Sequence, residues 1–220
     1  MFVGHYGVSF AAKRVAPTIP LWALFVAVQL LDVFWAPLVV FGIEKIRIVP
    51  GITASNPFDL YYMPYTHSLL AALLWSGGAL LVYRWLAPRN LAGKAGSVVA
   101  LAVFSHWLLD LLVHRPDLPL YDDTAKVGLG LWNLPAVAFV LEAGLLFGGM
   151  WWYLASAAIP RLRVLVFGLV MLAIQAYIFF GPPPVSGNAA AVTALASYAV
   201  FAAVIARLER PTRASRQGAP

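Results

Sequence analysis

Three polar side chains recur at steps of four residues in an otherwise apolar stretch, FSHWLLDLLVH, which runs from residue 104 to residue 114. They are His106, Asp110 and His114. A helix turns about 100° per residue, so a step of four leaves about 40° of drift and aligns the three side chains on one stripe. Histidine nitrogen and carboxylate oxygen are ligands that zinc accepts in catalytic sites, and a His-x-x-x-Asp pair places two such donors one helical turn apart. The stretch therefore predicts a metal site on a helix.

Other ionisable residues interrupt apolar runs elsewhere in the chain. His67 begins a second run in PYTHSLL, Asp32 lies halfway along an earlier run in QLLDVFW, and Glu142 has a similar place in a later one. A carboxylate at such depth costs at least ~2.5 kcal/mol on insertion scales, so each is a functional candidate. We expect the histidines and two of the three acids, Asp32 and Asp110, to converge on one cavity, where either acid could also accept a proton.

Each of these residues also has a structural interpretation. A histidine within a membrane helix, such as His106, can hydrogen-bond a backbone carbonyl across the bundle. His114 lies eight residues beyond it, about 12 Å along a helix, and is too far for the same ion. It would serve a second metal, the substrate, or only the carbonyls at the end of its own helix. Asp32 and Glu142 could each be a lone buried acid held protonated.

The N-terminal segment carries the fourth histidine, His5, between two glycines. It precedes the basic pair Lys13–Arg14 by eight residues, which as helix reaches about 12 Å back into a bilayer. A helix lying on the membrane surface needs a broad polar face, which this segment lacks. We therefore expect Met1–Ala12 to enter the bundle, with His5 among the metal ligands or against His106 or Asp32 when no metal is bound. The alternative is a helix on the membrane surface, in which case the metal site would consist of Asp32, His67, His106 and Asp110 without His5.

Composition identifies the surroundings of these residues as a membrane. Of 220 residues 62% are hydrophobic and 11% charged, whereas soluble domains have about a quarter charged residues. The mean hydropathy is +0.82. Six apolar runs approach the length of about 17–25 residues that crosses a bilayer. They are Leu21–Phe41, Ser68–Trp85, Ser97–Val113, Trp132–Ala158, Val164–Phe180 and Ala189–Ile205.

We predict an all-α fold, a polytopic membrane helix bundle of about six transmembrane helices with a short N-terminal re-entrant helix. Residues 1–220 would form a single integral membrane domain, with the re-entrant segment at 1–17 and a cytoplasmic basic tail at 206–220. No cysteine is present, so disulfides and thiolate metal sites are excluded.

Basic residues indicate the orientation in the membrane. Six spans place eleven Lys and Arg residues on one side and four on the other, which predicts that both termini are cytoplasmic. The net charge of +6 is explained by these flanking positions, so we expect no nucleic-acid partner. The larger group is Lys13, Arg14, Arg84, Arg89, Lys94, Arg161, Arg163, Arg207, Arg210, Arg213 and Arg216, and the smaller is Lys45, Arg47, Arg115 and Lys126.

Four motifs, GHYGVSFAAKR, LLDVFW, PYTHSLL and SHWLLD, occur in an order that resembles the bacterial inner-membrane metal-dependent hydrolases of unknown substrate. That family is remotely similar to zinc-dependent phospholipases C and single-strand nucleases. The resemblance covers residues 4–133, and it implies a location in the bacterial inner membrane. The family's Pro-Asp-x-Asp motif is reduced here to a single Asp32, and no histidine stands four residues before Glu142, which favours one or two ions over three. The implied metal ligands are His5, Asp32, His67, His106 and Asp110.

These features together predict a membrane hydrolase that uses zinc or a similar divalent ion to activate water. Its substrate would carry a phosphoester or related bond and be lipid-associated or a small periplasmic molecule, with membrane lipids as its partners. Alternatives are a small transporter or permease that relays protons or binds a cation through intramembrane His and Asp, and a non-catalytic scaffold. Transporters often show internal repeats, and none is visible. Residues expected to support the ligands or contact substrate are Tyr65, Thr66, Ser105, His114 and Glu142.

Overall fold

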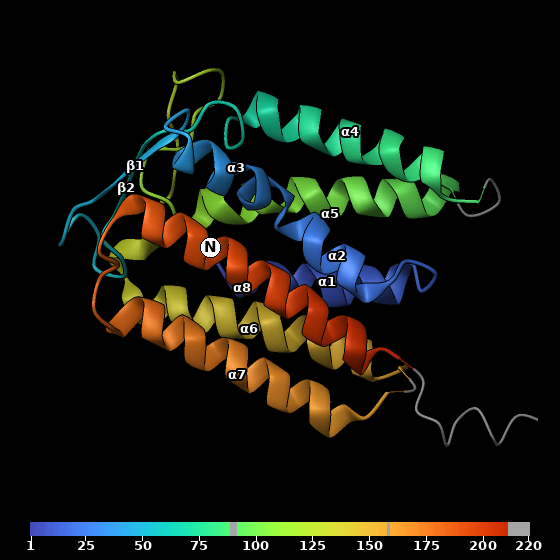
Figure 1. Cartoon of the computed structure of the whole chain (residues 1–220). Helices are drawn as coiled ribbons and strands as arrows, with labels where there is room; N and C mark the ends of the chain where they lie inside the picture. Colours follow the sequence, from blue (N-terminus) through green and yellow to red (C-terminus); the bar gives the residue numbers. More distant parts are fainter. Residues whose placement is uncertain (89–91, 158, 211–220) are drawn as a thin grey trace, which may run out of the picture.

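The computed structural model describes residues 1–88, 92–157 and 159–210, and it is a helix bundle (Figure 1). Within these ranges, five helices are long and apolar enough to cross a membrane, and a bent helix pair makes a sixth candidate span. The predicted all-α membrane bundle is thus confirmed. The five helices are α4 (Leu69–Leu86), α5 (Ala92–Val113), α6 (Pro135–Leu154), α7 (Arg161–Phe180) and α8 (Gly187–Leu208).

The first predicted span is broken in its middle. Helices α2 (Leu21–Val28) and α3 (Leu30–Val40) meet at an angle of 54°. Between them Gln29 leaves the helical region of φ and ψ, and its buried side-chain amide donates to the backbone carbonyl of Phe2 at 3.3 Å. The helix is therefore interrupted at Gln29, where a side-chain hydrogen bond to the N-terminal segment accompanies the loss of regular helical geometry. After the break α3 packs chiefly on α8, whereas α2 packs on α1, α5 and α8.

Helix α1 (Gly4–Val15) lies inside the bundle, as the sequence predicted, and packs most closely on α6. It runs from the middle of the bundle to the end that carries its basic pair (Figure 1). Two glycines allow this approach, because a Cβ atom at Gly7 would overlap the backbone of Leu145 and one at Gly149 would overlap the backbone of Gly7. Tyr6 and Phe10 are fully buried against the neighbouring helices.

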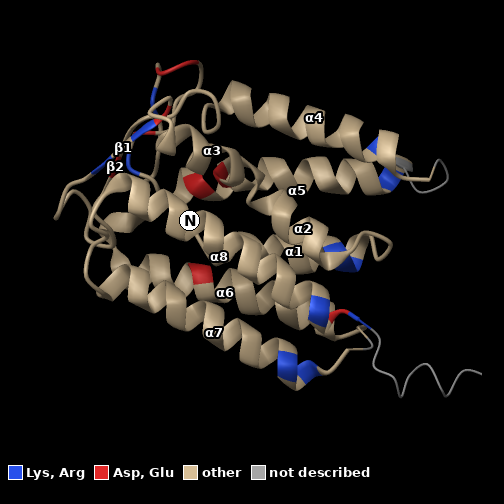
Figure 2. Ribbon diagram, in the orientation of Figure 1, with Lys and Arg blue, Asp and Glu red and all other residues tan. Residues whose placement is uncertain are grey.

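The two ends of the bundle differ in charge and in structure (Figure 2). Most of the described Lys and Arg residues gather at one end, here called the basic end, on or next to α1, α4, α5, α7 and α8, whereas Lys45, Arg47, Arg115 and Lys126 lie at the other end. The other end, here called the loop end, carries the segment 114–130 and an antiparallel hairpin of β1 (Lys45–Ile48) and β2 (Phe58–Tyr62). This hairpin was not predicted, because four or five residues are too few for a clear alternating pattern. Arg89, Arg213, Arg216 and the tail from residue 211 lie outside the described residues.

Candidate metal centre

Four side chains from three parts of the chain converge inside the bundle. Asp32 lies on α3, His67 lies just before α4, and both His106 and Asp110 lie on α5. Asp32 Oδ1 is 3.3 Å from His67 Nε2 and 3.7 Å from His106 Nε2. Asp110 Oδ2 is 3.1 Å from His106 Nε2 and 3.8 Å from His67 Nε2. We call these four residues the His/Asp cage.

The nitrogen–oxygen distances in the cage are those of neighbouring ligands around one ion. Two donors about 2.1 Å from a tetrahedral zinc ion lie about 3.4 Å from each other. The four nitrogen–oxygen distances in the cage range from 3.1 to 3.8 Å, on both sides of that value. Three of the four exceed the usual limit of about 3.2 Å for an N–H···O hydrogen bond. The arrangement is therefore closer to a ligand set than to a hydrogen-bonded cluster.

The break in the first span fixes the orientation of His106. Val28 ends α2, and the last carbonyls of a helix have no partner within it. His106 Nδ1 lies 2.7 Å from the carbonyl oxygen of Val28. Because a carbonyl only accepts, Nδ1 carries a proton, and Nε2, which bears a lone pair in the neutral imidazole, faces the carboxylates.

A chain of hydrogen bonds fixes His67 in the same way. The Thr66 hydroxyl lies 2.7 Å from His67 Nδ1 and donates to Glu44 Oε2 at 2.6 Å. Its oxygen therefore accepts from Nδ1–H, and the lone pair of His67 Nε2 faces the cage. Burial raises the pKa of the Glu44 carboxyl above its ordinary value, although this carboxyl also accepts the backbone N–H groups of Tyr65 and Thr66.

In the described part of the chain, buried ring nitrogens of the cage and of the neighbouring His5 lack hydrogen-bond partners. Among the described residues, His106 Nε2 and both ring nitrogens of His5 have no hydrogen bond. An unsatisfied buried polar atom costs about 1–3 kcal/mol, and lone pairs facing carboxylate oxygens add electrostatic repulsion. A cation between the two nitrogens and the two carboxylates removes both penalties, so these residues fit a metal ion.

His5 comes from α1 and is fully buried beside the cage. Its ring is stacked on that of His106, with centroids 4.0 Å apart and planes 7° from parallel, which is the contact expected without metal. His5 Nε2 lies 3.2 Å from Asp110 Oδ1, which the α-amino group of Met1 also contacts. Ligand atoms within 4.8 Å of one another form two groups, one of Asp32, His67 and His106 and one of His5, His106 and Asp110.

His114 lies on the loop-end side of Asp110. Its Nδ1 donates to Asp117 Oδ1 at 2.8 Å, and its Nε2 lies 3.6 Å from Asp110 Oδ2. The ring packs on Trp132, with centroids 4.2 Å apart. The two groups of ligand atoms do not include His114, so it supports Asp110 from outside them. Asp117 is a supporting residue that was not predicted, although an acid three residues after a histidine at a helix end indicates such a pair.

Glu142 and Thr66 have supporting positions. Thr66 orients His67, as described. Glu142 is fully buried on α6 and accepts from the backbone N–H of Phe2 at 2.8 Å and of Gly4 at 3.2 Å. Glu142 therefore holds the start of α1, and with it His5, but does not belong to either group of ligand atoms.

Tyr65 and Ser105 do not support the ligands as expected. Tyr65 is 51% exposed, and its hydroxyl lies 3.4 Å from that of Tyr62. Ser105 donates to the carbonyl of Ala102 on its own helix at 2.7 Å. In the described part of the chain neither side chain bonds to the cage. Adjacency in sequence misled here: Ser105 precedes His106 on α5, where successive residues point about 100° apart, and Tyr65 lies in the turn before α4.

Tyr198 on α8 is a further cage contact that the sequence did not indicate. Its hydroxyl donates to Asp32 Oδ2 at 2.6 Å, while Oδ1 of the same carboxylate faces the histidines. Nothing in the spacing of the last span distinguishes Tyr198 from the aromatic residues that pack elsewhere in the bundle. Only the position of α8 against α3 brings the two groups together.

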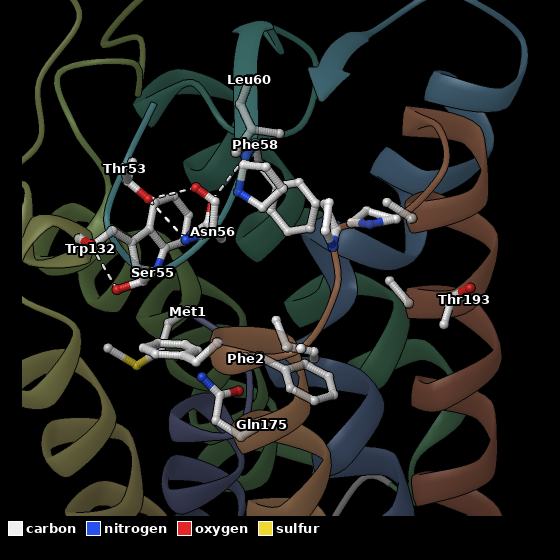
Figure 3. Close-up of a pocket in the computed structure, with 18 of the residues that line it drawn as sticks. Met1, Phe2, Thr53, Ser55, Asn56, Phe58, Leu60, Trp132, Gln175 and Thr193 are labelled. Atoms are coloured by element: carbon white, nitrogen blue, oxygen red, sulfur yellow. Dashed lines mark hydrogen bonds between the residues drawn. The ribbon is translucent and has the colours of Figure 1, made fainter. Parts of the chain in front are cut away.

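A cavity of about 850 Å³ reaches the cage from the loop end (Figure 3). Asp32, His67 and Asp110 line it at the cage. Much of the rest of its wall comes from α7, α8, the segment 50–60 and the loop 181–185, and Met1, Phe2 and Glu142 also line it. A molecule in this cavity can therefore touch the ligands from within the bundle.

Comparisons of the chain with protein-family models, with curated proteins and with solved structures found no match.

Proposed function

We propose that this protein is an integral membrane hydrolase with one divalent ion, zinc or a similar metal, held by the His/Asp cage. A single observation carries the proposal. Two histidines whose Nδ1 atoms are each bonded to protein acceptors direct their Nε2 atoms at two carboxylates, with nitrogen–oxygen distances of 3.1 to 3.8 Å. The resemblance of the sequence motifs to membrane metal-dependent hydrolases agrees with this assignment.

The shared histidine favours one ion over two. His106 belongs to both groups of ligand atoms, yet it offers only Nε2, because its Nδ1 is bonded to Val28. One imidazole nitrogen binds one metal ion, so the two groups cannot be filled at once through His106. His5 is the fifth candidate donor to the same ion, beside Asp110.

The reaction proposed is hydrolysis of a phosphoester. A bound divalent ion supplies Lewis acidity and lowers the pKa of a water molecule toward neutrality. In hydrolysis the water oxygen forms a bond to phosphorus, the ester P–O bond breaks, and the proton lost by the water reaches the leaving oxygen. Asp32 is placed to carry that proton instead of binding the ion, because its side chain is 14% exposed and lines the cavity, and this leaves one position of the ion open for the water. Tyr198 holds the carboxylate in place. Both oxygens of Asp110 face other groups, which suits a ligand.

The location is proposed on the same basis. The basic end would face the cytoplasm and the loop end the periplasm, by the positive-inside rule. The bacterial inner membrane is the compartment that the motif resemblance implies. The cavity and the cage would then be reached from the outer half of the bilayer.

Metal analysis of the full chain purified in detergent tests the proposal. We expect one zinc or similar ion per chain, lost in His106→Ala and in Asp110→Asn while circular dichroism still reports a helical fold. Ser105→Ala is the matched control on α5 and should keep the metal. Full occupancy in both ligand variants would remove the site. Hydrolysis of a chromogenic aryl phosphodiester should follow occupancy across the same variants.

A cation transporter is the second candidate, and the break between α2 and α3 favours it. Transporters place substrate ions beside discontinuous helices, and this break adjoins the cage. Proteoliposomes that contain a zinc-sensitive dye distinguish the two functions. The hydrolase proposal predicts no cage-dependent uptake, whereas uptake lost in Asp32→Asn would support transport.

A further inference from the structure

The cavity that reaches the cage is enclosed on one side by an ordered segment of the loop end. Thr53, Ser55 and Asn56 are buried there and line the cavity. The Thr53 hydroxyl donates to the carbonyl of Asn56, and the Ser55 hydroxyl donates to that of Trp132, both at 2.7 Å (Figure 3). These bonds connect the segment to itself and to the short 3-10 helix Leu131–Asn133 that precedes α6, so this wall of the cavity is fixed.

The opposite wall lies between α7 and α8. Helix α8 packs chiefly on α3 and α2, and only sparsely on α7. Its residues that line the cavity before Tyr198 are small, and α7 contributes larger apolar side chains such as Ile174 and Ile178. The small residues are Ala189, Ala190, Thr193, Ala194 and Ser197. Small side chains on one helix and sparse packing between the two leave the space that the cavity occupies.

The cavity has an opening on the side of the bundle. Tyr177 on α7 is 63% exposed and Thr193 on α8 is also exposed, and both line the cavity. Both residues lie within helices that are apolar enough to span a membrane. Where these exposed residues line it, the cavity reaches the outer surface of the two helices, which would face lipid in a membrane, and its polar end lies at the cage.

A buried acceptor points to a ligand within this cavity. Gln175 lies on α7, is fully buried and lines the cavity, where Figure 3 shows its carboxamide. Its Nε2 donates to Glu142 Oε1 at 2.9 Å. Its Oε1 has no hydrogen-bond partner among the residues that the structure describes. A buried carboxamide oxygen of this kind favours a donor such as a hydroxyl group.

We propose that the cavity binds one acyl chain of a membrane phospholipid, which enters between α7 and α8 and brings its polar head toward the cage. A head-group hydroxyl then donates to Gln175 Oε1. The volume of about 850 Å³ falls within the range that holds ligands of drug size. This inference rests on the proposed hydrolase function and deepens it, because it makes a membrane lipid the substrate.

Photolabelling tests the acyl-chain site directly. The full chain is placed in vesicles of phosphatidylethanolamine and phosphatidylglycerol that contain phosphatidylglycerol with a diazirine midway along one chain. We expect labelled peptides from the cavity faces of α7 and α8, within residues 174–179 and 189–198. Labelling spread evenly over lipid-facing helices, such as the exposed face of α4, would overturn the site. Inorganic phosphate should not compete with the labelling, whereas lysophosphatidylglycerol should.

A matched pair of substitutions on α8 tests whether the cavity is responsible. Ala194 lines the cavity, whereas Ala196, two residues further, is exposed and does not line it. Ala194→Phe should abolish labelling at the cavity, and Ala196→Phe should leave it at the parent level. Parent-level labelling of folded Ala194→Phe would overturn the proposal. If Ala194→Phe does not fold, Thr193→Phe at the exposed rim replaces it, and the map of labelled peptides in the parent decides independently.

Metal content in the same samples separates this inference from the hydrolase proposal. Ala194→Phe should keep its metal, and His106→Ala should lose metal yet keep the labelled cavity. Metal without cavity labelling in the parent would defeat the acyl-chain site alone. Cavity labelling without metal would defeat the hydrolase and leave a lipid-binding site.

Discussion

Replacing the Thr66 hydroxyl tests how the cage is oriented. Thr66→Val keeps the volume of the side chain and removes both of its hydrogen bonds, the one at 2.7 Å to His67 Nδ1 and the one at 2.6 Å to Glu44 Oε2. His67 then loses the acceptor that fixes the proton on Nδ1, so Nε2 is no longer held as a lone pair toward Asp32.

The expected size of this effect follows from the contacts. Loss of a bond that orients a metal-binding histidine weakens metal affinity by about 10- to 100-fold, or about 1.4–2.8 kcal/mol. The metal-free protein should also lose about 1–3 kcal/mol of stability, because a buried ring nitrogen and a buried carboxylate oxygen each lose a partner. Glu44 keeps two backbone donors on Oε1, which limits the second effect.

Competition between the purified protein and a fluorescent zinc chelator measures the affinity, and thermal unfolding after chelation measures the stability. Thr66→Ser keeps the hydroxyl and is the matched control, which should bind zinc within a few-fold of the parent. Zinc affinity of Thr66→Val within twofold of the parent would refute the reasoning, since it would mean that Thr66 does not orient His67.

Further predictions concern the topology, α1 and Glu44. A cysteine at the exposed Tyr65 should react with an impermeant thiol reagent applied outside intact cells, and labelling only after permeabilisation would reverse the orientation. His5→Ala should weaken zinc binding in the chelator assay, and parent affinity would remove His5 from the ligand set. Gly149→Ala should lower stability by about 1–3 kcal/mol in thermal unfolding, because its Cβ overlaps the backbone of Gly7, while Gly148→Ala, which meets no neighbour, should not. Since burial raises the folded-state pKa of Glu44 above its ordinary 4.5, its contribution to stability is full at lower pH and is lost as pH rises through the folded value. Glu44→Gln should therefore flatten the loss of metal-free stability above pH 4.5, and an unchanged pH profile would contradict this.

The membrane class of the fold was determined by local sequence. A run of apolar residues long enough to cross a bilayer forms a helix because lipid offers no other partner for its backbone groups. The same reasoning placed α1 inside the bundle, since its near-absence of charge before Lys13 suits an apolar environment. It also selected the cage residues, because an ionisable side chain is costly in such a helix wherever that helix packs.

Only the tertiary structure decided how these side chains meet. The 3.3 Å between Asp32 and His67 depends on the bend at Gln29, which is maintained by a contact with Phe2 from another segment. Tyr198 is many residues distant in sequence from Asp32 and yet donates to it. Sequence spacing fixes distances within one helix, as between His106 and Asp110, whereas distances between helices are set by the packing of many residues together. For the same physical reason the cavity between α7 and α8 could not be predicted from either helix alone.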